Sequence, residues 1–498
     1  MSQSAISTSP GIGILKAIFS FPVSLAGTLV VLATLTVRAR FDDPDMWWHL
    51  KTGEFIWTTH TIPRSDYFSS TALHQPWIPH EWLSEVTIYG AFKLGGLSGL
   101  MGWLCVLTSV LLIAGYWFCS AYSGNAKVGF MGAVAIWLFG TAGFAVRPQM
   151  IGYCFLILEL LLIHLGRTRN PNWFFCLPPL LGVWINCHGS FSLGIALAAI
   201  FLFSSFFEFR LGLLVAHRWE PRCRRLFILA LVLSVAALFL NPVGLRQVLY
   251  PFAVLRDMSV NVSDVSEWQP LQLANFRGIA FLGVIGLVFL TVIMRKAELF
   301  WDELLLLMAG IWLAAQHDRL IFVFGILTAP VLSRLLSDSW EGYDANADRA
   351  WPNALLIGVS LLIAFLAVPN RQNLEKQVEA QSTVKALEFI RANHLIGPML
   401  NEWVSGGYLM WAAPEYPVFI DGRGDPFVLN GVFGDFGNWA MLRTDPNKLL
   451  EKYHIQFCLV SPQSPMVQIF PLLPNWKSVY ADDHSVVFVR TSSTIPAR

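Results

Sequence analysis

The sequence predicts a multispanning α-helical membrane protein with a C-terminal extracytoplasmic α/β domain. Hydrophobic residues make up 55% of the 498 residues and charged residues only 13%, whereas charged residues make up about 25% of a soluble domain. Many apolar runs approach the roughly 20 residues that cross a bilayer as a helix. Residues 370–498 differ, because short strand-like and helix-like patterns alternate there.

The apolar runs define about eleven predicted spans within a transmembrane domain of residues 1–369. The first is too long for the apolar core of a cleaved signal peptide, and Arg38 and Arg40 follow it instead of small residues, so it reads as a first span or signal anchor. The predicted spans are 17–37, 97–120, 127–146, 149–166, 173–187, 190–209, 226–241, 277–294, 304–316, 319–335 and 352–369.

Charge and cysteine content narrow the class further. The net charge of +1 gives no indication of a nucleic-acid partner, and the sequence has neither a basic tail nor a glycine-rich phosphate loop. The seven cysteines are scattered, mostly inside apolar runs, without metal or disulfide spacing. Cysteine chemistry is therefore not expected.

The basic residues predict the orientation. A cytoplasmic N-terminus places most of them in short cytoplasmic loops, as the positive-inside tendency requires, and Arg38 and Arg40 are the exceptions. Eleven spans then place the predicted domain 370–498 outside. The residues that fit are Lys127, Arg167, Arg169, Arg210, Arg218, Arg222, Arg224, Arg225, Arg295, Lys296 and Arg334.

The first external loop, residues 41–96, is the main candidate for a functional site. Between positions 41 and 85 it carries many acids and histidines interleaved with tryptophans. Acids beside amphipathic rings at the mouth of a span suit a site at the water–lipid boundary. The candidate catalytic residues are Asp43, Asp45, Glu81 and His80. A purely solvated loop, or acids that only cap a helix, is the structural alternative.

Four further polar clusters fall on the same predicted face. They contain Arg147 and Gln149, Asn186 and His188, Asn241 with Glu267 and Trp268, and His317, Asp318 and Arg319. Ionisable groups at helix ends are costly unless they pair or face a cavity, so the clusters predict a shared polar cavity. Each cluster has a structural alternative. In the same order, these are a snorkelling arginine, a core histidine bonded to a backbone carbonyl, a helix stop and turn, and a local ion pair.

The C-terminal domain is expected to combine helices at 381–393 and 445–453 with strands before Asn401 and at 416–421, 455–460 and 485–490. Its polar segments are 401–408 and 421–425. Loops rich in Gly, Asp and Arg often contact ligands, although turn formation alone also explains the glycines. Tyr408, Asp421 and Arg423 are the candidate ligand contacts there.

The layout resembles the GT-C superfamily of integral membrane glycosyltransferases. Residues 41–63, FDDPDMWWHLKTGEFIWTTHTIP, are similar in layout to the first external loop of oligosaccharyltransferase catalytic subunits, and protein mannosyltransferases share this architecture. Residues 401–408, NEWVSGGY, resemble the acceptor motif at the start of their soluble domain, but Val404, Ser405 and Gly406 stand where that motif has its aspartate. The blocks WWHL, HEWLSE, RPQ and FIDGR also resemble uncharacterised bacterial multispanning proteins.

This resemblance implies sugar transfer from a polyprenyl-phosphate or polyprenyl-diphosphate donor to a glycan, lipid or protein acceptor outside the cytoplasm. The expected location is the bacterial cytoplasmic membrane, with the active site facing the exterior. Arginines suit the donor phosphate, and a carboxylate is needed to take the acceptor proton. The predicted substrate-binding residues are Arg147, Gln149, Asn186, His188, Glu267, Trp268, His317, Arg319, Tyr408, Asp421 and Arg423, with Arg246 as a further phosphate contact.

Within the first loop, Asp45 is the preferred base and Asp43 orients it or shares a metal. Two acids at this spacing lie on one face of an extended segment, where they could hold Mg²⁺ or Mn²⁺ or raise the pKa of one of them. Glu81 and His80 would close the site. The alternatives are a transporter or flippase for a lipid-linked or anionic solute, or an enzyme of the O-antigen ligase or polymerase type.

Overall fold

The computed structural model describes residues 16–257 and 269–491, and the chain divides into two compact units. Unit 1 comprises the chain up to Arg38, Leu104–Phe144 and Gln149–Val368. Unit 2 comprises Ala39–Trp103, Ala145–Pro148 and the chain from Pro369 onward. Unit 2 is thus assembled from three separate stretches of sequence, and each of them includes acids or arginines singled out above.

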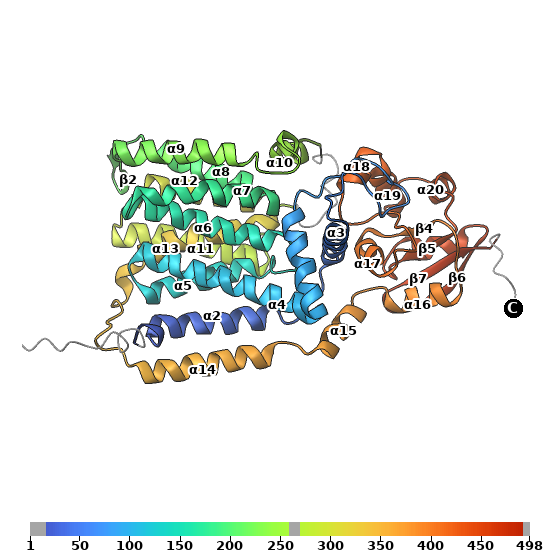
Figure 1. Ribbon diagram of the computed structural model, residues 1–498, viewed down its shortest axis with the longest axis horizontal. Coiled ribbons are helices and arrows are strands. Elements are labelled where there is room, and N and C mark those ends of the chain that lie inside the picture. The colour runs from blue at the N-terminus through green and yellow to red at the C-terminus, as the bar shows by residue number, and fades with distance from the viewer. Residues whose placement is uncertain (1–15, 258–268, 492–498) are drawn as a thin grey trace, which may run out of the picture. The chain divides into compact units, whose positions relative to one another are not determined.

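Unit 1 is a bundle of helices with one small sheet, in which α2 and α14 run side by side (Figure 1). A helix coincides with each of the eleven predicted apolar segments, so the helices are confirmed, while the number of membrane crossings stays a prediction. The helices are α2 (Phe21–Val37), α4 (Trp82–Ser123, shared with unit 2), α5 (Ala126–Gly140), α6 (Gln149–Thr168), α7 (Leu177–Cys187), α8 (Phe191–Ser204), α9 (Pro221–Ala237), α10 (Leu245–Asp257), α11 (Phe276–Arg295), α12 (Trp301–Gln316), α13 (Ile321–Leu335) and α14 (Ala350–Ala367). The small sheet has the order β1 (Phe209–Leu211), β2 (Leu214–Ala216), β3 (Leu299–Phe300).

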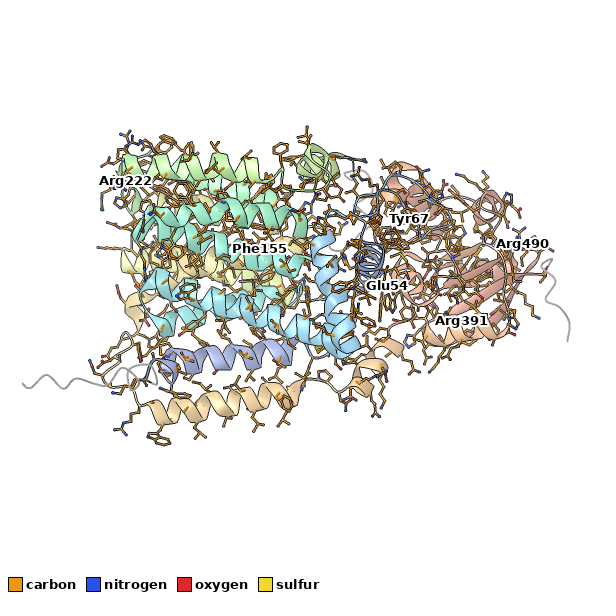
Figure 2. All side chains as sticks on the ribbon, in the orientation of Figure 1. Glu54, Tyr67, Phe155, Arg222, Arg391 and Arg490 are labelled. Atoms are coloured by element: carbon orange, nitrogen blue, oxygen red, sulfur yellow. The ribbon has the colours of Figure 1, made fainter. Side chains whose placement is uncertain are left out.

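Four of the described helices are long and apolar enough to cross a membrane, judged by length and composition. They are α4, α6, α11 and α14. The shorter helices α2, α5 and α8 are also apolar. Helix ends follow local chemistry, since the Asn125 and Asn275 side chains accept hydrogen bonds from the first turns of α5 and α11. Pro221 begins α9, and Arg222 follows it in the first turn (Figure 2).

Unit 2 contains a four-stranded sheet of order β4-β5-β7-β6. Strand β4 pairs parallel with β5, and the other two pairs are antiparallel. The strands are β4 (Met399–Asn401), β5 (Phe457–Val460), β6 (Trp476–Ala481) and β7 (Val486–Arg490). The helices are α3 (Asp45–Thr59), the first part of α4, α15 (Arg371–Glu379), α16 (Val384–Ala392), α17 (Trp403–Ala412), α18 (Asp425–Leu429), α19 (Val432–Ala440), α20 (Pro446–Lys452) and α21 (Met466–Ile469). Helix α4 is broken by non-helical backbone at Gly95 and Gly96.

Both faces of this sheet are covered, because the alternating side chains of its strands enter two different apolar clusters. Phe457 and Leu459 of β5 pack with α16 and α17. Cys458 and Val460 face the other way and pack with α19 and α20. In Figure 1, α16 and α20 accordingly lie on opposite sides of the strands. Helices lie near the predicted ranges 381–393 and 445–453, and strands lie near 455–460 and 485–490. An extracytoplasmic α/β domain at 370–498 stays a prediction.

The prediction of a strand at 416–421 is wrong, because this segment does not form a strand in the structure. This segment is buried, as its apolar sequence predicts, with Val418, Phe419 and Ile420 all 0% exposed. Its backbone N–H and C=O groups, however, do not form the regular hydrogen-bond ladder of a strand. The Asn401 side chain bonds to the Phe419 N–H at 2.7 Å and to the Ile420 carbonyl at 2.7 Å. Val418 bonds to the first loop, where it forms a single bridge with Ser69.

Two arginines of unit 2 pair with acids at the surface. Arg391 of α16 lies 2.6 Å from Glu415, and Arg490 at the end of β7 lies 2.8 Å from Glu451 (Figure 2). Exposed pairs of this kind contribute roughly 0–1 kcal/mol each. The fold of unit 2 therefore depends on its apolar layers and on the buried charges described next.

Candidate active site

The first turn of α3 positions the two acids that the sequence singles out. Pro44 has φ −67° and ψ −25°, which is already helical, so Asp45 is the first residue of α3. The extended arrangement expected for Asp43 and Asp45 is therefore wrong. Asp43 Oδ1 accepts a hydrogen bond from the Asp45 backbone N–H at 2.9 Å. Both carboxylates nevertheless reach the same cation.

That cation is Arg147. Its Nε donates to Asp43 Oδ2, and its Nη2 lies 3.1 Å from Asp45 Oδ2. The Asp43, Asp45 and Arg147 side chains are 9%, 21% and 15% exposed, so this α3 trio remains partly open to solvent. With two acids and one base its formal charge is −1. The guanidinium fixes both carboxylates, and Asp45 is the more accessible one.

The arrangement of the α3 trio does not fit a divalent cation. The carboxylates proposed as Mg²⁺ or Mn²⁺ ligands are both bonded to the Arg147 guanidinium. Among the residues that the structure describes, no group of three or more His, Cys, Asp or Glu side chains is placed to hold a metal ion.

A second polar cluster begins one helical turn after Asp45. His49 lies four residues later on α3, 3.2 Å from Glu85 Oε1 and 4.0 Å from Glu81 Oε2. The His49 and Glu85 side chains are 3% and 1% exposed. His80 Nε2 lies 3.6 Å from Glu81 Oε1. His80 and Glu81 are among the predicted catalytic residues, whereas His49 and Glu85 are not, although their four-residue spacings from Asp45 and from Glu81 indicate them.

The environment of His80 favours its charged form. Burial lowers the pKa of the imidazole, but the charge of Glu81, its hydrogen bond and the charge of Asp425 outweigh this effect. The pKa of His80 is therefore raised above 6.5. His80 is a cation held between two acids as the pH falls.

A second arrangement of two aspartates around one arginine is completely buried. Arg423 donates from Nε and Nη2 to the two oxygens of Asp421, at 2.8 and 2.6 Å, and from Nη1 to Asp66 at 2.5 Å. All three side chains are 0% exposed. The guanidinium also lies 4.6 Å from the Trp77 ring centre. In this buried trio Asp421 and Arg423 do not reach solvent, so their predicted role as substrate contacts is not retained.

Tyr408 lies beside α3 at the wall of a cavity. Its ring meets Trp47 edge to face, with 5.2 Å between ring centres, and burial raises the pKa of its hydroxyl. The cavity measures about 260 Å³, and Asp43, Trp47, Glu402 and Tyr408 are among its lining residues. Burial raises the pKa of Glu402, although hydrogen bonds from Ser464 and the Ser461 backbone oppose the shift. The cavity thus adjoins the α3 trio.

The remaining predicted residues belong to unit 1. Arg319 Nη2 lies 3.5 Å from Gln149 Oε1. Asn186 donates to the Leu240 carbonyl at 2.9 Å, and His188 Nδ1 lies 2.7 Å from the Ser190 hydroxyl. The Ser190 contact differs from the backbone-carbonyl contact of the structural alternative for His188, and the roles of Gln149, Asn186 and His188 stay predictions.

Three further unit 1 expectations have different outcomes. Asp318 pairs at 2.8 Å with Arg277 of α11. Asn241 Oδ1 accepts hydrogen bonds from the Val243 and Gly244 N–H groups, which confirms the predicted turn. Glu267 and Trp268 lie outside the described residues. The roles of Arg246, His317 and Arg319 stay predictions.

No family model matches this sequence, and no curated protein matches it. The structure is similar to an apo oligosaccharyltransferase from Archaeoglobus fulgidus, with a TM-score of 0.52, 11% identity, and coverage of 88% of this chain and 69% of the other. It is also similar to ArnT from Cupriavidus metallidurans bound to undecaprenyl phosphate, with a TM-score of 0.51, 10% identity, and coverage of 99% and 100%.

A third similar structure is the archaeal oligosaccharyltransferase AglB from Archaeoglobus fulgidus in complex with an inhibitory peptide and a dolichol-phosphate. The TM-score is 0.51 at 12% identity, over 87% of this chain and 69% of the other. These likenesses confirm a GT-C-like fold. At such identities they establish the fold and leave the reaction to be argued from the site.

Proposed function

We propose that this chain is a membrane glycosyltransferase that moves a sugar from a polyprenyl-phosphate-linked donor to an acceptor outside the cytoplasm. The observation that carries the proposal is the α3 trio, which presents a partly exposed carboxylate, Asp45, at the start of a helix in a GT-C-like fold. Solved structures with this fold include one bound to undecaprenyl phosphate and one bound to dolichol-phosphate and a peptide. Both of these lipids are polyprenyl phosphates, the type of carrier that the proposal requires.

The chemistry follows from what each group can accept or donate. The acceptor hydroxyl oxygen forms the new bond to the anomeric carbon, and its proton passes to Asp45 as general base. The bond between the anomeric carbon and the donor phosphate oxygen breaks, and its electron pair leaves with the phosphate. Asp43 and Arg147 hold Asp45 in place. Asp45 is chosen over Asp43 because its side chain is 21% exposed and that of Asp43 is 9% exposed.

The proposal includes the location of the enzyme. The charge distribution favours a multi-pass protein of the bacterial cytoplasmic membrane, in the cell envelope, with the transmembrane domain at 1–369 and an external domain at 370–498. The test is cysteine labelling after replacing the exposed Cys176 by serine. Leu472→Cys, at a site that is 78% exposed, should react with an impermeant reagent from outside, and Arg222→Cys only after permeabilisation. The reverse pattern contradicts the orientation.

The decisive test of the chemistry is Asp45→Asn. Asparagine keeps the size of the side chain but cannot act as a base, so transfer should fall by about 10² to 10⁴-fold while the protein remains folded. The assay supplies a panel of undecaprenyl-phosphate-linked hexoses and pentoses and measures release of undecaprenyl phosphate. Asp42→Asn is the matched control, because Asp42 lies in the same segment, is 42% exposed and pairs only loosely with Arg40 at 3.9 Å. If Asp43→Asn and Asp45→Asn both stay within about threefold of wild type, the proposal loses its base.

A further inference from the structure

The loop that follows the buried segment 418–420 touches the proposed base directly. A methyl group on Gly422 would lie 2.1 Å from Asp45 Oδ1, 3.2 Å from Asp45 Cγ and 2.9 Å from Trp48 Nε1. Gly422 does not have a positive φ, so its backbone suits any residue. The restriction at this position is therefore purely steric, and it comes from α3.

The loop cannot move away to make room. Asp421 and Arg423, on either side of Gly422, belong to the buried trio and are held there by three hydrogen bonds from the guanidinium. On the other side of the loop, Gly406 of α17 is packed so closely that a methyl group on it would lie 2.1 Å from the Ile420 carbonyl oxygen. The position of Gly422 is thus fixed from both directions.

The α3 side of the contact is also fixed. Asp45 Oδ2 is held by Arg147 at 3.1 Å, and a methyl group on Gly407 would lie 2.6 Å from the Pro44 carbonyl oxygen, so α17 packs against the start of α3. The Trp48 side chain is 9% exposed, and its Nε1 has no hydrogen-bond partner within the described part of the chain. A buried N–H left unpaired is costly, and this one faces the same point as the Asp45 carboxylate.

We propose that Gly422 is a positioning residue for Asp45. Because Gly422 has no side chain, the Asp45 carboxylate can occupy the space beside it, and the buried trio fixes the position of the Gly422 backbone. The inference rests on the proposed function, since it assigns Gly422 a role through the base. It also gives the buried trio a part in the reaction without contact to substrate. An added methyl group meets the Asp45 carboxylate at 2.1 Å and the Trp48 indole nitrogen at 2.9 Å. The carboxylate is the closer contact and lies at the end of the more flexible side chain, so it is the group that is displaced.

The test is Gly422→Ala, with Gly434→Ala as matched control. Gly434 lies in α19 of the same unit, and nothing lies within 4 Å of a methyl group placed on it. With the undecaprenyl-phosphate sugar panel, Gly422→Ala should lower kcat about 100-fold, because displacement of a reacting group by about 1 Å has an effect of this size. The donor KM and the thermal unfolding midpoint should stay near those of wild type. Gly434→Ala should leave kcat and the donor KM unchanged and should leave the unfolding midpoint equal or slightly raised, because alanine favours a helix more than glycine does.

The double variant separates positioning from a general structural effect. In an Asp45→Asn background, Gly422→Ala should produce no further loss, because the group through which it acts is already inactive. Multiplying losses, or normal kcat in Gly422→Ala when Asp45→Asn is impaired, would overturn the inference and leave the proposed function intact. Normal transfer in Asp45→Asn, or no turnover of any donor by wild type, would overturn both. If Gly422→Ala reduces the yield of folded protein, Gly422→Ala/Asp45→Ala must restore it, and failure to do so overturns the inference.

Discussion

Two sites in unit 2 combine one arginine with two aspartates, but they differ in their exposure to solvent. The buried trio of Asp66, Asp421 and Arg423 is 0% exposed throughout. The α3 trio of Asp43, Asp45 and Arg147 keeps between 9% and 21% of each side chain in contact with solvent. The first is bidentate and packed under Trp77, as expected of a structural site. The difference teaches that residue types alone do not distinguish a structural site from a candidate catalytic site, whereas solvent access to one carboxylate distinguishes these two trios.

The largest effect is expected at the buried trio. Arg423→Ala leaves two buried carboxylates without their cation, which should lower the free energy of unfolding by about 3–5 kcal/mol. Chemical denaturation of the purified protein in detergent measures this. A loss below about 1 kcal/mol would remove the contrast between the two trios, because it is the value of an exposed pair.

Arg147→Ala should have a smaller effect of a different kind. Loss of a charged hydrogen bond costs about 1.5–3 kcal/mol, and this loss should appear in transfer, at least tenfold, because the partly exposed acids can be rehydrated. The free energy of unfolding should change by about 1 kcal/mol or less. Undecaprenyl phosphate release and denaturation are measured on the same preparation. The opposite pattern, unfolding with intact turnover in the folded fraction, would make the α3 trio another structural site.

The arginines of the two trios stay charged at all ordinary pH values, whereas His80 loses its charge as the pH rises. Its pKa in the folded protein is raised, so the stabilisation it provides is fully present below the unfolded value of 6.5 and is lost as pH rises through the raised pKa. The thermal unfolding midpoint should therefore decline over this window. His80→Gln should remove that part of the decline. Equal slopes in the two proteins would show that Glu81 and Asp425 do not hold a protonated His80.

The smallest effect is expected at a surface pair. Arg391 and Glu415 are 46% and 45% exposed, so Arg391→Ala should change the free energy of unfolding by about 1 kcal/mol or less and leave transfer unchanged. Chemical denaturation of Arg391→Ala measures this change, which is the reference value for an exposed ion pair when the two trios are compared. A cost comparable with that of Arg423→Ala would show that burial does not explain the contrast.

Much of the helical architecture could be predicted, because an apolar run near the length of a span has few alternatives to a helix in lipid. The segment 416–421 shows where this reasoning stops. Its apolar pattern predicts burial, but the hydrogen-bond partner is an Asn401 side chain that no local pattern specifies.

The candidate site shows the same limit. Asp43 and Asp45 stand out in the sequence by their position after an apolar segment. Their partner Arg147 lies 104 residues away from Asp43, and the contact of Gly422 with Asp45 joins residues that are even further apart. Spacing within α3 indicates His49, but only the packed structure brings Gly422 and the carboxylate together.

The long separation between the first loop and the C-terminal domain has a consequence for synthesis. Asp66 and Arg423 are 357 residues apart, and the Thr71 hydroxyl donates to the Phe419 carbonyl across 348 residues. At about 5–20 residues per second, the first loop waits roughly 20 to 70 s on the ribosome before its partners exist. The entropic cost of closing a loop grows only slowly with its length. The long separation therefore delays the contact but reduces its stability only slightly. Until Arg423 has been synthesised, Asp66 lacks the guanidinium that it contacts in the folded chain, so the buried trio is completed late in translation.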